Sequence, residues 1–344
     1  MLKTEPQREI PDPANDREAF SGPQANAWRE ANLKEINQLL DRQSWDLVPP
    51  DQIPPATRIL GVRFVRVVKW IPNPDSDYTH IAEGKPGARA EQSQDFVVDK
   101  FKSRLVVQGF GLRQGIDYGK SFSQNMSAED NRTLSCLAAW YNLYLQTGDI
   151  KGFYLRGKLE GKDVAYWRQA KGYEVEGKED WVCRGRNSVY RLPQSGTLAQ
   201  KALTEVLTIK DKFKQGATGP MVFAKHSPKP AGDSILVVGY FVDDSKFLTN
   251  DLTEIPKMKK LLDANGLELT INADPKKFQG VQVEIDRKAG TVTHHQENNV
   301  LALIEQLRLR ECIPRDNLMN ANYELRCPQG QKEVGREKQA RKFG

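Results

Sequence analysis

Two neighbouring carboxylates, Asp243 and Asp244, are the residues of this sequence with the clearest capacity for chemistry. They follow residues 235–242, a nearly continuous apolar run of the length expected for a buried strand. Adjacent like charges repel, so a cation beside them would stabilise the pair, and a divalent metal held by carboxylate oxygens is the obvious candidate. An isolated Asp-Asp pair is also typical of a solvated acidic turn, so the rest of the chain must decide between the two interpretations.

A third carboxylate, Asp149, stands directly before the apolar segment 150–155. Residues 127–130 (Ser-Ala-Glu-Asp) have the spacing of a capping box. The apolar face that follows, from Leu134 to Leu145, predicts a helix that ends at Gly148. Asp149 is therefore expected at the start of a strand that follows this helix.

The elements around these carboxylates predict one sheet. Residues 235–242 and 246–249 predict a β-hairpin with Asp243-Asp244 as its turn, and helices are predicted at 197–213 and 256–266. Together with the strand at Asp149, the order is strand, helix, strand, strand, helix, strand, which is the split βαβ pattern of a ferredoxin-like sheet. This order would place Asp149 beside the hairpin turn, although Asp149 and Asp243 are 94 positions apart.

The remaining patterns complete an α+β protein. Residues 71–99 are rich in Pro, Asp, Ser and Gly and predict a long exposed loop, residues 1–22 an irregular leader, and residues 326–344 a disordered basic tail. Further elements are expected as helices from Ala25 and at 300–307, as β-rich segments at 43–48, 58–70, 100–110 and 182–192, and as a second hairpin at 280–285 and 291–293.

Composition limits the class of protein. The chain has 344 residues, 38% of them hydrophobic, which is enough for a sizeable core in two or three subdomains. A formal net charge of +6 fits a nucleic-acid partner. The cysteines have no metal-ligand or disulfide spacing, and no signal peptide or membrane-spanning run is recognisable. We therefore expect an intracellular protein, cytoplasmic or nuclear, with no membrane contact.

Two of the predicted strands, at 58–70 and 100–110, are strongly basic. We expect their basic side chains to form a positive wall that contacts phosphates without reading sequence. The wall would consist of Arg63, Arg66, Lys69, Lys102 and Arg104.

A competing interpretation comes from Gly109, Gly111 and Gly115, which follow an apolar strand as in a dinucleotide-binding loop. Their spacing differs by one residue from that motif, and no apolar-periodic helix begins at Gly111. An NAD-dependent oxidoreductase is therefore the weaker hypothesis.

Several motifs occur in the order found in one known family. They are Trp-Arg-Glu-Ala at 28–31, Ser-Trp-Asp-Leu-Val at 44–48, Ser-Arg-Leu-Val-Val-Gln-Gly-Phe at 103–110, Asp-Ile-Lys at 149–151, Ser-Val-Tyr at 188–190, Phe-Val-Asp-Asp at 241–244 and Gly-Val-Gln-Val-Glu-Ile at 280–285. As an ordered set, they resemble the reverse transcriptase of copia-type LTR retrotransposons from about residue 19 to about residue 320.

The resemblance implies a right-hand polymerase whose palm carries the ferredoxin-like sheet. By it, residues 23–145 correspond to the fingers, 146–290 to the palm and 291–325 to the start of a thumb. Nucleotide addition is in-line phosphoryl transfer assisted by two Mg²⁺ or Mn²⁺ ions. The implied metal ligands and catalytic residues are Asp149, Asp243 and Asp244.

The resemblance also implies how substrates bind. Lys102 and Arg104 would face the triphosphate of a dNTP, Tyr154 would lie under the incoming sugar, and Gln194 would touch an RNA or DNA template-primer. Without the resemblance, Tyr154 could equally be a core aromatic, Lys102 and Arg104 a solvated strand face, and Gln194 a plain turn residue.

The sequence departs from the family where substrate is positioned. Residues 191–197 read Arg-Leu-Pro-Gln-Ser-Gly-Thr where the family has Gly-Leu-Lys-Gln-Ala-Pro-Arg, and residues 152–154 read Gly-Phe-Tyr where it has Thr-Ala-Phe. We therefore expect a degenerate, truncated RNA-directed DNA polymerase domain. The alternative is a non-catalytic remnant of the same fold that binds nucleic acid.

Overall fold

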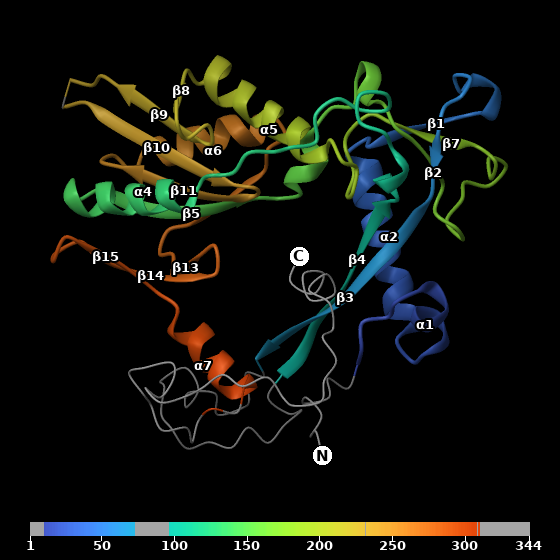
Figure 1. Ribbon diagram of the computed structural model, residues 1–344, viewed down its shortest axis with the longest axis horizontal. Coiled ribbons are helices and arrows are strands. Elements are labelled where there is room, and N and C mark those ends of the chain that lie inside the picture. The colour runs from blue at the N-terminus through green and yellow to red at the C-terminus, as the bar shows by residue number, and fades with distance from the viewer. Residues whose placement is uncertain (1–9, 73–95, 231, 308, 310–344) are drawn as a thin grey trace, which may run out of the picture. The chain divides into compact units, whose positions relative to one another are not determined.

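The computed structural model describes residues 10–72, 96–230, 232–307 and 309 (Figure 1). The chain divides into two units, residues 1–295 and residues 296–344, and α7 (Glu297–Gln306) is the helix described in the second. The predicted tail at 326–344 and most of the predicted loop at 71–99 lie outside the described residues. No helix in the described part of the chain is long and apolar enough to cross a membrane.

A six-stranded antiparallel sheet dominates the first unit (Figure 1). Its strands lie in the order β12 (Leu269–Asn272), β5 (Tyr144–Ile150), β11 (Asp244–Thr249), β10 (Ser234–Phe241), β9 (Val222–Ser227) and β8 (Lys214–Gln215). Helix α5 (Ser195–Glu205) lies between β5 and β10 along the chain, and α6 (Glu254–Ala264) lies between β11 and β12. The predicted alternation of strands and helices is confirmed in part. The strand predicted at 280–285 belongs to a different sheet, and the last strand of this one is β12, which is too short to show a period in the sequence. Strands β8 and β9 were not predicted.

Helices α4 (Ala128–Trp140), α5 and α6 share a hydrophobic core with this sheet. The strands contribute side chains that are completely buried, and the helices contribute their apolar stripes. The core includes Leu134, Leu203, Leu207, Val238, Tyr240, Phe247, Leu248, Met258 and Leu262. The hairpin β10–β11 is therefore central to the packing of the unit.

Helix α4 ends earlier than the sequence predicted. It begins at the expected capping box, in which Ser127 and Asp130 exchange both hydrogen bonds. It ends at Trp140, and Asn142, with a φ of 47°, turns the chain out of the helix. Leu145 and Thr147 are then buried at alternate positions of β5, so the predicted helix to Gly148 was wrong over residues 141–148, about its last two turns.

Gly148 lies inside β5 and does not end a helix. A Cβ at this position would lie 2.6 Å from the Thr270 carbonyl oxygen and 2.9 Å from the Phe247 ring. Glycine is needed here because β12 and the Phe247 side chain approach the β5 backbone too closely for any larger residue.

The turn of the β10–β11 hairpin is Val242-Asp243, not the predicted Asp243-Asp244. Phe241 pairs with Asp244, which makes Asp244 the first residue of β11. Val242 has a φ of 58°, a left-handed conformation that β-branched residues rarely adopt and that costs on the order of 1–3 kcal/mol. Two-residue hairpin turns need such a φ to match the strand twist. The Asn125 side chain holds the turn by accepting a hydrogen bond from Val242 N at 3.2 Å.

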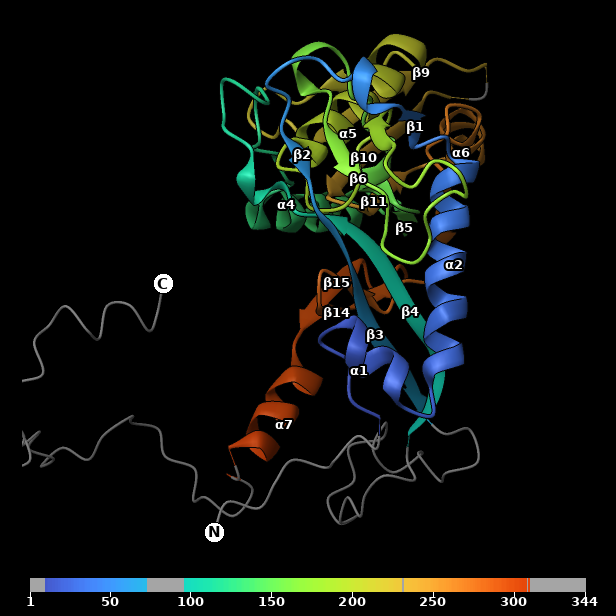
Figure 2. The same cartoon turned by 90° about the vertical axis from the view of Figure 1, so that its right-hand side faces the viewer.

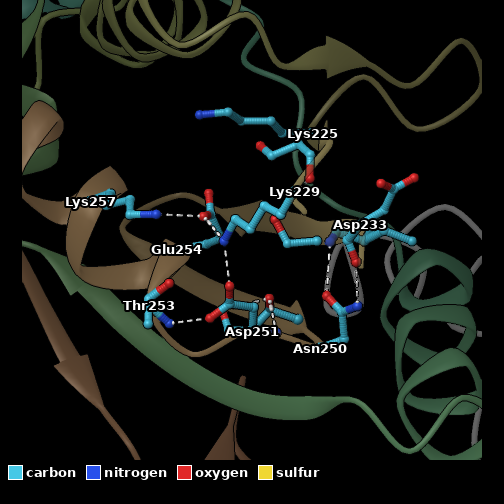
Figure 3. A network of polar contacts seen from close by, with 12 residues as sticks. Lys225, Lys229, Asp233, Asn250, Asp251, Thr253, Glu254 and Lys257 are labelled. Atoms are coloured by element: carbon cyan, nitrogen blue, oxygen red, sulfur yellow. Dashed lines mark hydrogen bonds and ion pairs between the residues drawn. The ribbon is translucent and has the colours of Figure 1, made fainter. Parts of the chain in front are cut away.

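A network of ion pairs fixes the opposite end of the hairpin (Figure 3). Lys229, after β9, pairs with Asp251 and with Glu254 at 2.7 Å, and Lys257 reaches the same Glu254 oxygen at 2.8 Å. Asn250 accepts a hydrogen bond from Ile235 N at 2.9 Å. The β9–β10 and β11–α6 connections are thereby joined, and both ends of the hairpin are held.

A long two-stranded ribbon, β3 (Val62–Pro72) with β4 (Phe96–Val107), runs alongside α2 (Ala25–Asp41) in Figure 2. The strands extend into both ends of the segment predicted as a loop at 71–99. Two side chains of α2 form hydrogen bonds with the ribbon. Asn32 Oδ1 accepts a hydrogen bond from Ser103 Oγ at 2.7 Å, and Glu35 Oε1 accepts one from Leu105 N at 3.2 Å.

Arg66 does not belong to the predicted positive wall. It is 3% exposed and lies on the face of β3 opposite to Arg63 and Lys69. Its guanidinium pairs with Asp16 at 2.7 Å, donates to Asn32 Oδ1 at 3.3 Å and lies over the rings of Phe20 and Phe64. The prediction failed for Arg66 because strand residues alternate between faces, and Arg66 is an odd number of residues from both.

Two smaller sheets and several short helices complete the first unit. The leader predicted to be irregular contains α1 (Asp16–Ser21). One sheet has the order β1 (Trp45–Val48), β7 (Val182–Gly185), β6 (Tyr166–Arg168) and β2 (Ile59–Leu60), and the other has β13 (Lys277–Phe278), β14 (Val281–Asp286) and β15 (Thr291–His295). The predicted second hairpin, β14–β15, is confirmed. The single turns are η1 (Pro50–Gln52), η2 (Gly109–Gly111), η3 (Phe153–Arg156), η4 (Gly161–Asp163) and the π-type η5 (Val206–Lys210).

Because Arg66 and Arg63 lie on opposite faces of the ribbon, their substitution should change the free energy of unfolding by different amounts. Arg66→Met should lower the free energy of unfolding by about 2–3 kcal/mol, because it removes a hydrogen bond to a buried acceptor and two cation–π contacts. Arg63→Met, on the exposed face, should change it by less than about 0.5 kcal/mol. Urea unfolding of both variants measures the difference, and equal destabilisation would contradict the assignment of faces.

Candidate active site

The pairing of β5 with β11 brings the three aspartates together. Asp149 is the direct cross-strand partner of Asp244, so both side chains project from the same side of the sheet. Asp243 occupies the turn just before β11, and its carbonyl oxygen accepts a hydrogen bond from Ile150 N at 2.9 Å. The convergence predicted from the order of elements is present in the structure, but Asp149 lies near the end of β5, not at the start of a strand as predicted, because the strand already begins at Tyr144.

Burial and mutual repulsion both oppose the ionised form of these carboxylates. Burial raises the pKa of Asp149, and the Asp243 charge raises it further, while Lys102 and Lys151 act in the opposite direction. Burial also raises the pKa of Asp244, followed by the charges of Asp243 and Asp149. A cation at this edge would relieve the repulsion, because opposite charge favours the ionised carboxylates.

The side chains gathered here offer carboxylate oxygens as donors. Carboxylate oxygens are preferred Mg²⁺ ligands, and Mg²⁺ in phosphoryl-transfer enzymes is bound by one or two carboxylates together with substrate phosphates and water. Among the described residues, no group of three or more His, Cys, Asp or Glu side chains is arranged so that it could hold a metal ion. Asp149, Asp243 and Asp244 are the residues that would hold such ions.

Tyr154 lies close to these aspartates, at the wall of a cavity. It belongs to η3, which the chain reaches through Gly152 with a φ of 59°. The Ser188 hydroxyl donates a hydrogen bond to its carbonyl oxygen. Burial and the Asp243 charge raise the pKa of its phenol. The cavity, of about 450 Å³, is lined among others by Arg104, Ser123, Tyr154, Tyr190, Arg191 and Ser195.

A brace that the sequence did not reveal holds the loop bearing Tyr154. Arg156 Nη2 donates to Lys151 O at 2.9 Å and to Glu268 Oε1 at 3.0 Å, and Lys151 N donates to Glu268 O at 3.0 Å. Arg42 also reaches Glu268, at 3.5 Å. Arg156 and Glu268 are 112 positions apart, and neither lies in a recognisable motif, so no local signal could have paired them.

Lys102 and Arg104 lie on the exposed face of the ribbon. In the β3–β4 register they share this face with Arg63, Lys69 and Lys100. Burial lowers the pKa of Lys102, and the nearby charges of Arg104, Lys69 and Lys100 lower it further. Lys100 was missed in the sequence, although its alternation with Lys102 and Arg104 was the available signal. The basic face, as we define it, consists of Arg63, Lys69, Lys100, Lys102 and Arg104.

Gln194 is not placed to touch a template-primer. Its exposed fraction is 0%, and its Nε2 donates to the Asp163 carbonyl oxygen at 3.1 Å. It stands at the start of α5, where the first turn faces the interior. The prediction of a substrate contact for Gln194 was therefore wrong, and the residue connects α5 to the segment at Asp163.

Comparisons with known proteins show the family to which the chain belongs. Residues 85–320 match the family described as reverse transcriptase (RNA-dependent DNA polymerase). The chain is 26% identical over 271 residues to the retrovirus-related Pol polyprotein from transposon RE2 of Arabidopsis thaliana. It is 24% identical over 327 residues to that from transposon TNT 1-94 of Nicotiana tabacum. These matches cover 78% and 94% of this chain but only 16% and 22% of the two relatives.

The mixed helices and sheets, the acidic edge and the family match define a class. The chain belongs to the reverse transcriptase (RNA-dependent DNA polymerase) family, whose match covers well over half of its residues. Within that family, it is a reverse transcriptase domain of the kind found in copia-type retrotransposon Pol polyproteins, as the resemblance had indicated.

The repulsion among the aspartates predicts a stabilising substitution. Because the folded state raises the pKa of Asp244, its ionised form destabilises the fold, and this destabilisation disappears as pH falls through the folded-state pKa. In metal-free buffer at neutral pH, Asp244→Asn should therefore stabilise the protein, by less than about 1 kcal/mol because the site is partly solvated.

Thermal unfolding with a chelator measures this effect, and Asp51→Asn, on the exposed turn η1, is the matched control. Adding Mg²⁺ should stabilise wild-type protein more than Asp244→Asn. A lower melting temperature for Asp244→Asn in chelator would contradict the electrostatic interpretation.

Proposed function

We propose that this domain binds a primer-template and adds deoxynucleotides to the primer as an RNA-directed DNA polymerase. The observation that carries the proposal is the pairing of Asp149 with Asp244, which gathers three carboxylates at one edge of the six-stranded sheet. Membership of the reverse transcriptase family supports the reaction type.

The proposed architecture is that of a right-hand polymerase. The palm is residues 146–290, because this part supplies the strands that carry the aspartates. The fingers are residues 23–145, which include α2 and the β3–β4 ribbon, and the thumb begins within residues 291–325. Residues 326–344 would be a basic tail. An intracellular location remains a prediction from the sequence alone.

Each candidate residue has a proposed role in this reaction. Asp149 and Asp243, with Asp244 beside them, would hold two Mg²⁺ ions, which would supply electrostatic stabilisation of the charge that develops during phosphoryl transfer. Lys102 and Arg104 would orient the triphosphate by charge. Tyr154 would exclude a 2′-hydroxyl from the cavity that it lines. Competition between ribonucleotides and deoxynucleotides in a Tyr154→Val variant would test that role.

A non-catalytic nucleic-acid-binding remnant is the second candidate. The segment 191–197 has Pro193 and Thr197 where the family motif has its Lys and its Arg, and its Gln194 is buried. When a substrate is misplaced, the reaction rate falls by orders of magnitude, because correct positioning supplies much of the rate acceleration. We therefore propose that binding is kept and that extension is weak.

Primer extension on a poly-A template with an oligo-dT primer distinguishes the two candidates. Any extension should require Mg²⁺ or Mn²⁺ and should fall at least about a hundredfold in Asp243→Asn, because loss of one charged ligand removes electrostatic stabilisation of the transition state. Asp51→Asn, which lies outside the site, should extend like wild type.

Extension that survives Asp243→Asn would refute the catalytic assignment. Binding of primer-template without any metal-dependent extension in the wild type would favour the remnant instead.

Binding itself should depend on the basic face. The affinity for duplex should fall steeply with salt, because phosphate contacts release counterions. The double charge reversal Lys102→Glu/Arg104→Glu should weaken binding. It should also make the slope of log affinity against log salt concentration shallower, by about the amount expected for two lost phosphate contacts. Lys214→Glu/Lys260→Glu, on exposed positions of β8 and α6, is the matched control and should change neither. Fluorescence anisotropy at several salt concentrations measures both, and a flat salt response in the wild type would refute the proposed interface.

A further inference from the structure

The loop that carries Tyr154 is tied at both of its ends to one residue, Glu268. The Lys151 N–H donates to the Glu268 carbonyl oxygen at 3.0 Å where the loop begins, and Arg156 Nη2 donates to Glu268 Oε1 at 3.0 Å where it ends. The same Arg156 nitrogen donates to the Lys151 carbonyl oxygen at 2.9 Å, which joins the two ends of the loop directly. Glu268 immediately precedes β12, so the loop is fixed to the edge strand of the six-stranded sheet.

These ties matter because the loop leaves β5 through a glycine. Gly152 has a φ of 59°, and glycine adopts left-handed and right-handed conformations about equally well, so the backbone alone does not fix the direction of the turn that follows. A Cβ at Gly152 would lie 3.1 Å from Arg42 Nη1, and Arg42 also reaches Glu268 at 3.5 Å. The position of η3 relative to β5 therefore depends on Arg42, Arg156 and Glu268.

The Tyr154 ring follows any movement of this turn. Its neighbours Phe153 and Leu155 are 2% and 3% exposed and belong to two different hydrophobic clusters, which fixes the side of the turn from which Tyr154 projects. Tyr154 itself lines the cavity of about 450 Å³. The distance of the turn from β5 thus sets how far the ring reaches into the cavity.

The charges of this brace contribute little to stability. The hydrogen bond from Arg156 lowers the pKa of the Glu268 carboxyl, so Glu268 is a charged partner at neutral pH. Its side chain is nevertheless 50% exposed, and ion pairs that water screens to this extent stabilise a fold only weakly. Loss of the pair should therefore leave the protein folded.

The brace also has a cost. Arg42 Nη1 and Arg156 Nε are buried, and neither has a hydrogen-bond partner in the described part of the chain. Two cations that share one carboxylate and leave buried donors unpaired oppose folding, and local costs of this kind are typical of functional sites. Stability alone does not account for the arrangement.

We infer that Arg156 and Glu268 are positioning residues for nucleotide selection, because their ion pair holds the Tyr154 ring where it admits a deoxyribose and excludes a 2′-hydroxyl. The inference rests on the proposed function, in which Tyr154 meets the incoming sugar. Neither Arg156 nor Glu268 lines the cavity, so both act through the loop.

The test measures nucleotide binding, so that weak catalysis does not limit it. The protein is bound to a primer-template whose primer ends in a dideoxynucleotide, and the next complementary dNTP or rNTP is titrated in Mg²⁺ buffer. Retention of the duplex against a heparin competitor gives an apparent Kd for each nucleotide. In the wild type, the apparent Kd of the rNTP should exceed that of the dNTP at least about tenfold.

Two variants remove the brace from either side. Arg156→Met and Glu268→Ala should each reduce the ratio of the two apparent Kd values to below about threefold, because a displaced ring no longer meets the 2′ position. Lys225→Met is the matched control, because it breaks the partly buried ion pair between Lys225 of β9 and Asp211, and it should keep the wild-type ratio. Thermal unfolding checks that each variant is folded.

A double variant tests whether the brace acts through Tyr154. Tyr154→Val alone should reduce the ratio as far as Glu268→Ala does. Adding Glu268→Ala to Tyr154→Val should reduce it no further, because substitutions that act through one contact are not additive. A further reduction in the double variant would overturn the inference, since the brace would then act elsewhere.

Each other outcome overturns a defined statement. A wild-type ratio in both Arg156→Met and Glu268→Ala overturns the inference alone. Equal losses of dNTP and rNTP affinity also overturn it, since the brace would then support the site as a whole. A wild-type protein that binds both nucleotides equally overturns the inference and the role of Tyr154 but leaves the proposed polymerase standing, whereas binding of neither nucleotide overturns the inference and the proposed polymerase together.

Discussion

The register of the β5–β11 pair is the constraint on which the rest of the structure depends. It sets Asp149 opposite Asp244. Like charges therefore lie close together where the interior strands β5 and β11 meet the hairpin turn, although both repulsion and desolvation oppose this. A slip of one residue would turn one of the two side chains to the other face. Packing of Phe247 and Leu248 into the core, where both are fully buried, prevents such a slip.

Other costly features lie around this pair and are explained by it. Gly148 lets β12 approach β5, and Val242 adopts a left-handed conformation so that Asp243 can occupy the turn. The Lys229 network at the opposite end holds the hairpin in this position. The pattern is that of a site whose local strain and repulsion are maintained by a well-packed frame.

The β3–β4 ribbon separates buried from exposed charge by the alternation of its side chains. On one face, Arg66 is enclosed by Asp16, Asn32 and two aromatic rings and contributes to the packing against α2. On the other, the basic face remains available to phosphates. The frame around the aspartates is thus intact, whereas the segment 191–197 has lost basic side chains. This combination agrees with a domain that retains binding more fully than catalysis.

The sequence by itself determined the main helices and strands around the hairpin, the apolar core of the hairpin and the three aspartates that come together, because these depend on local periodicity and on motifs of adjacent residues. It could not determine where α4 ends, since Leu145 fits both a helical and an alternating pattern. It could not show that Gln194 turns inward or that Arg156 finds Glu268, because burial and long-range pairing are set by the packing of distant segments. Tertiary structure alone decided which side of each strand faces solvent, and so which charges can meet a substrate.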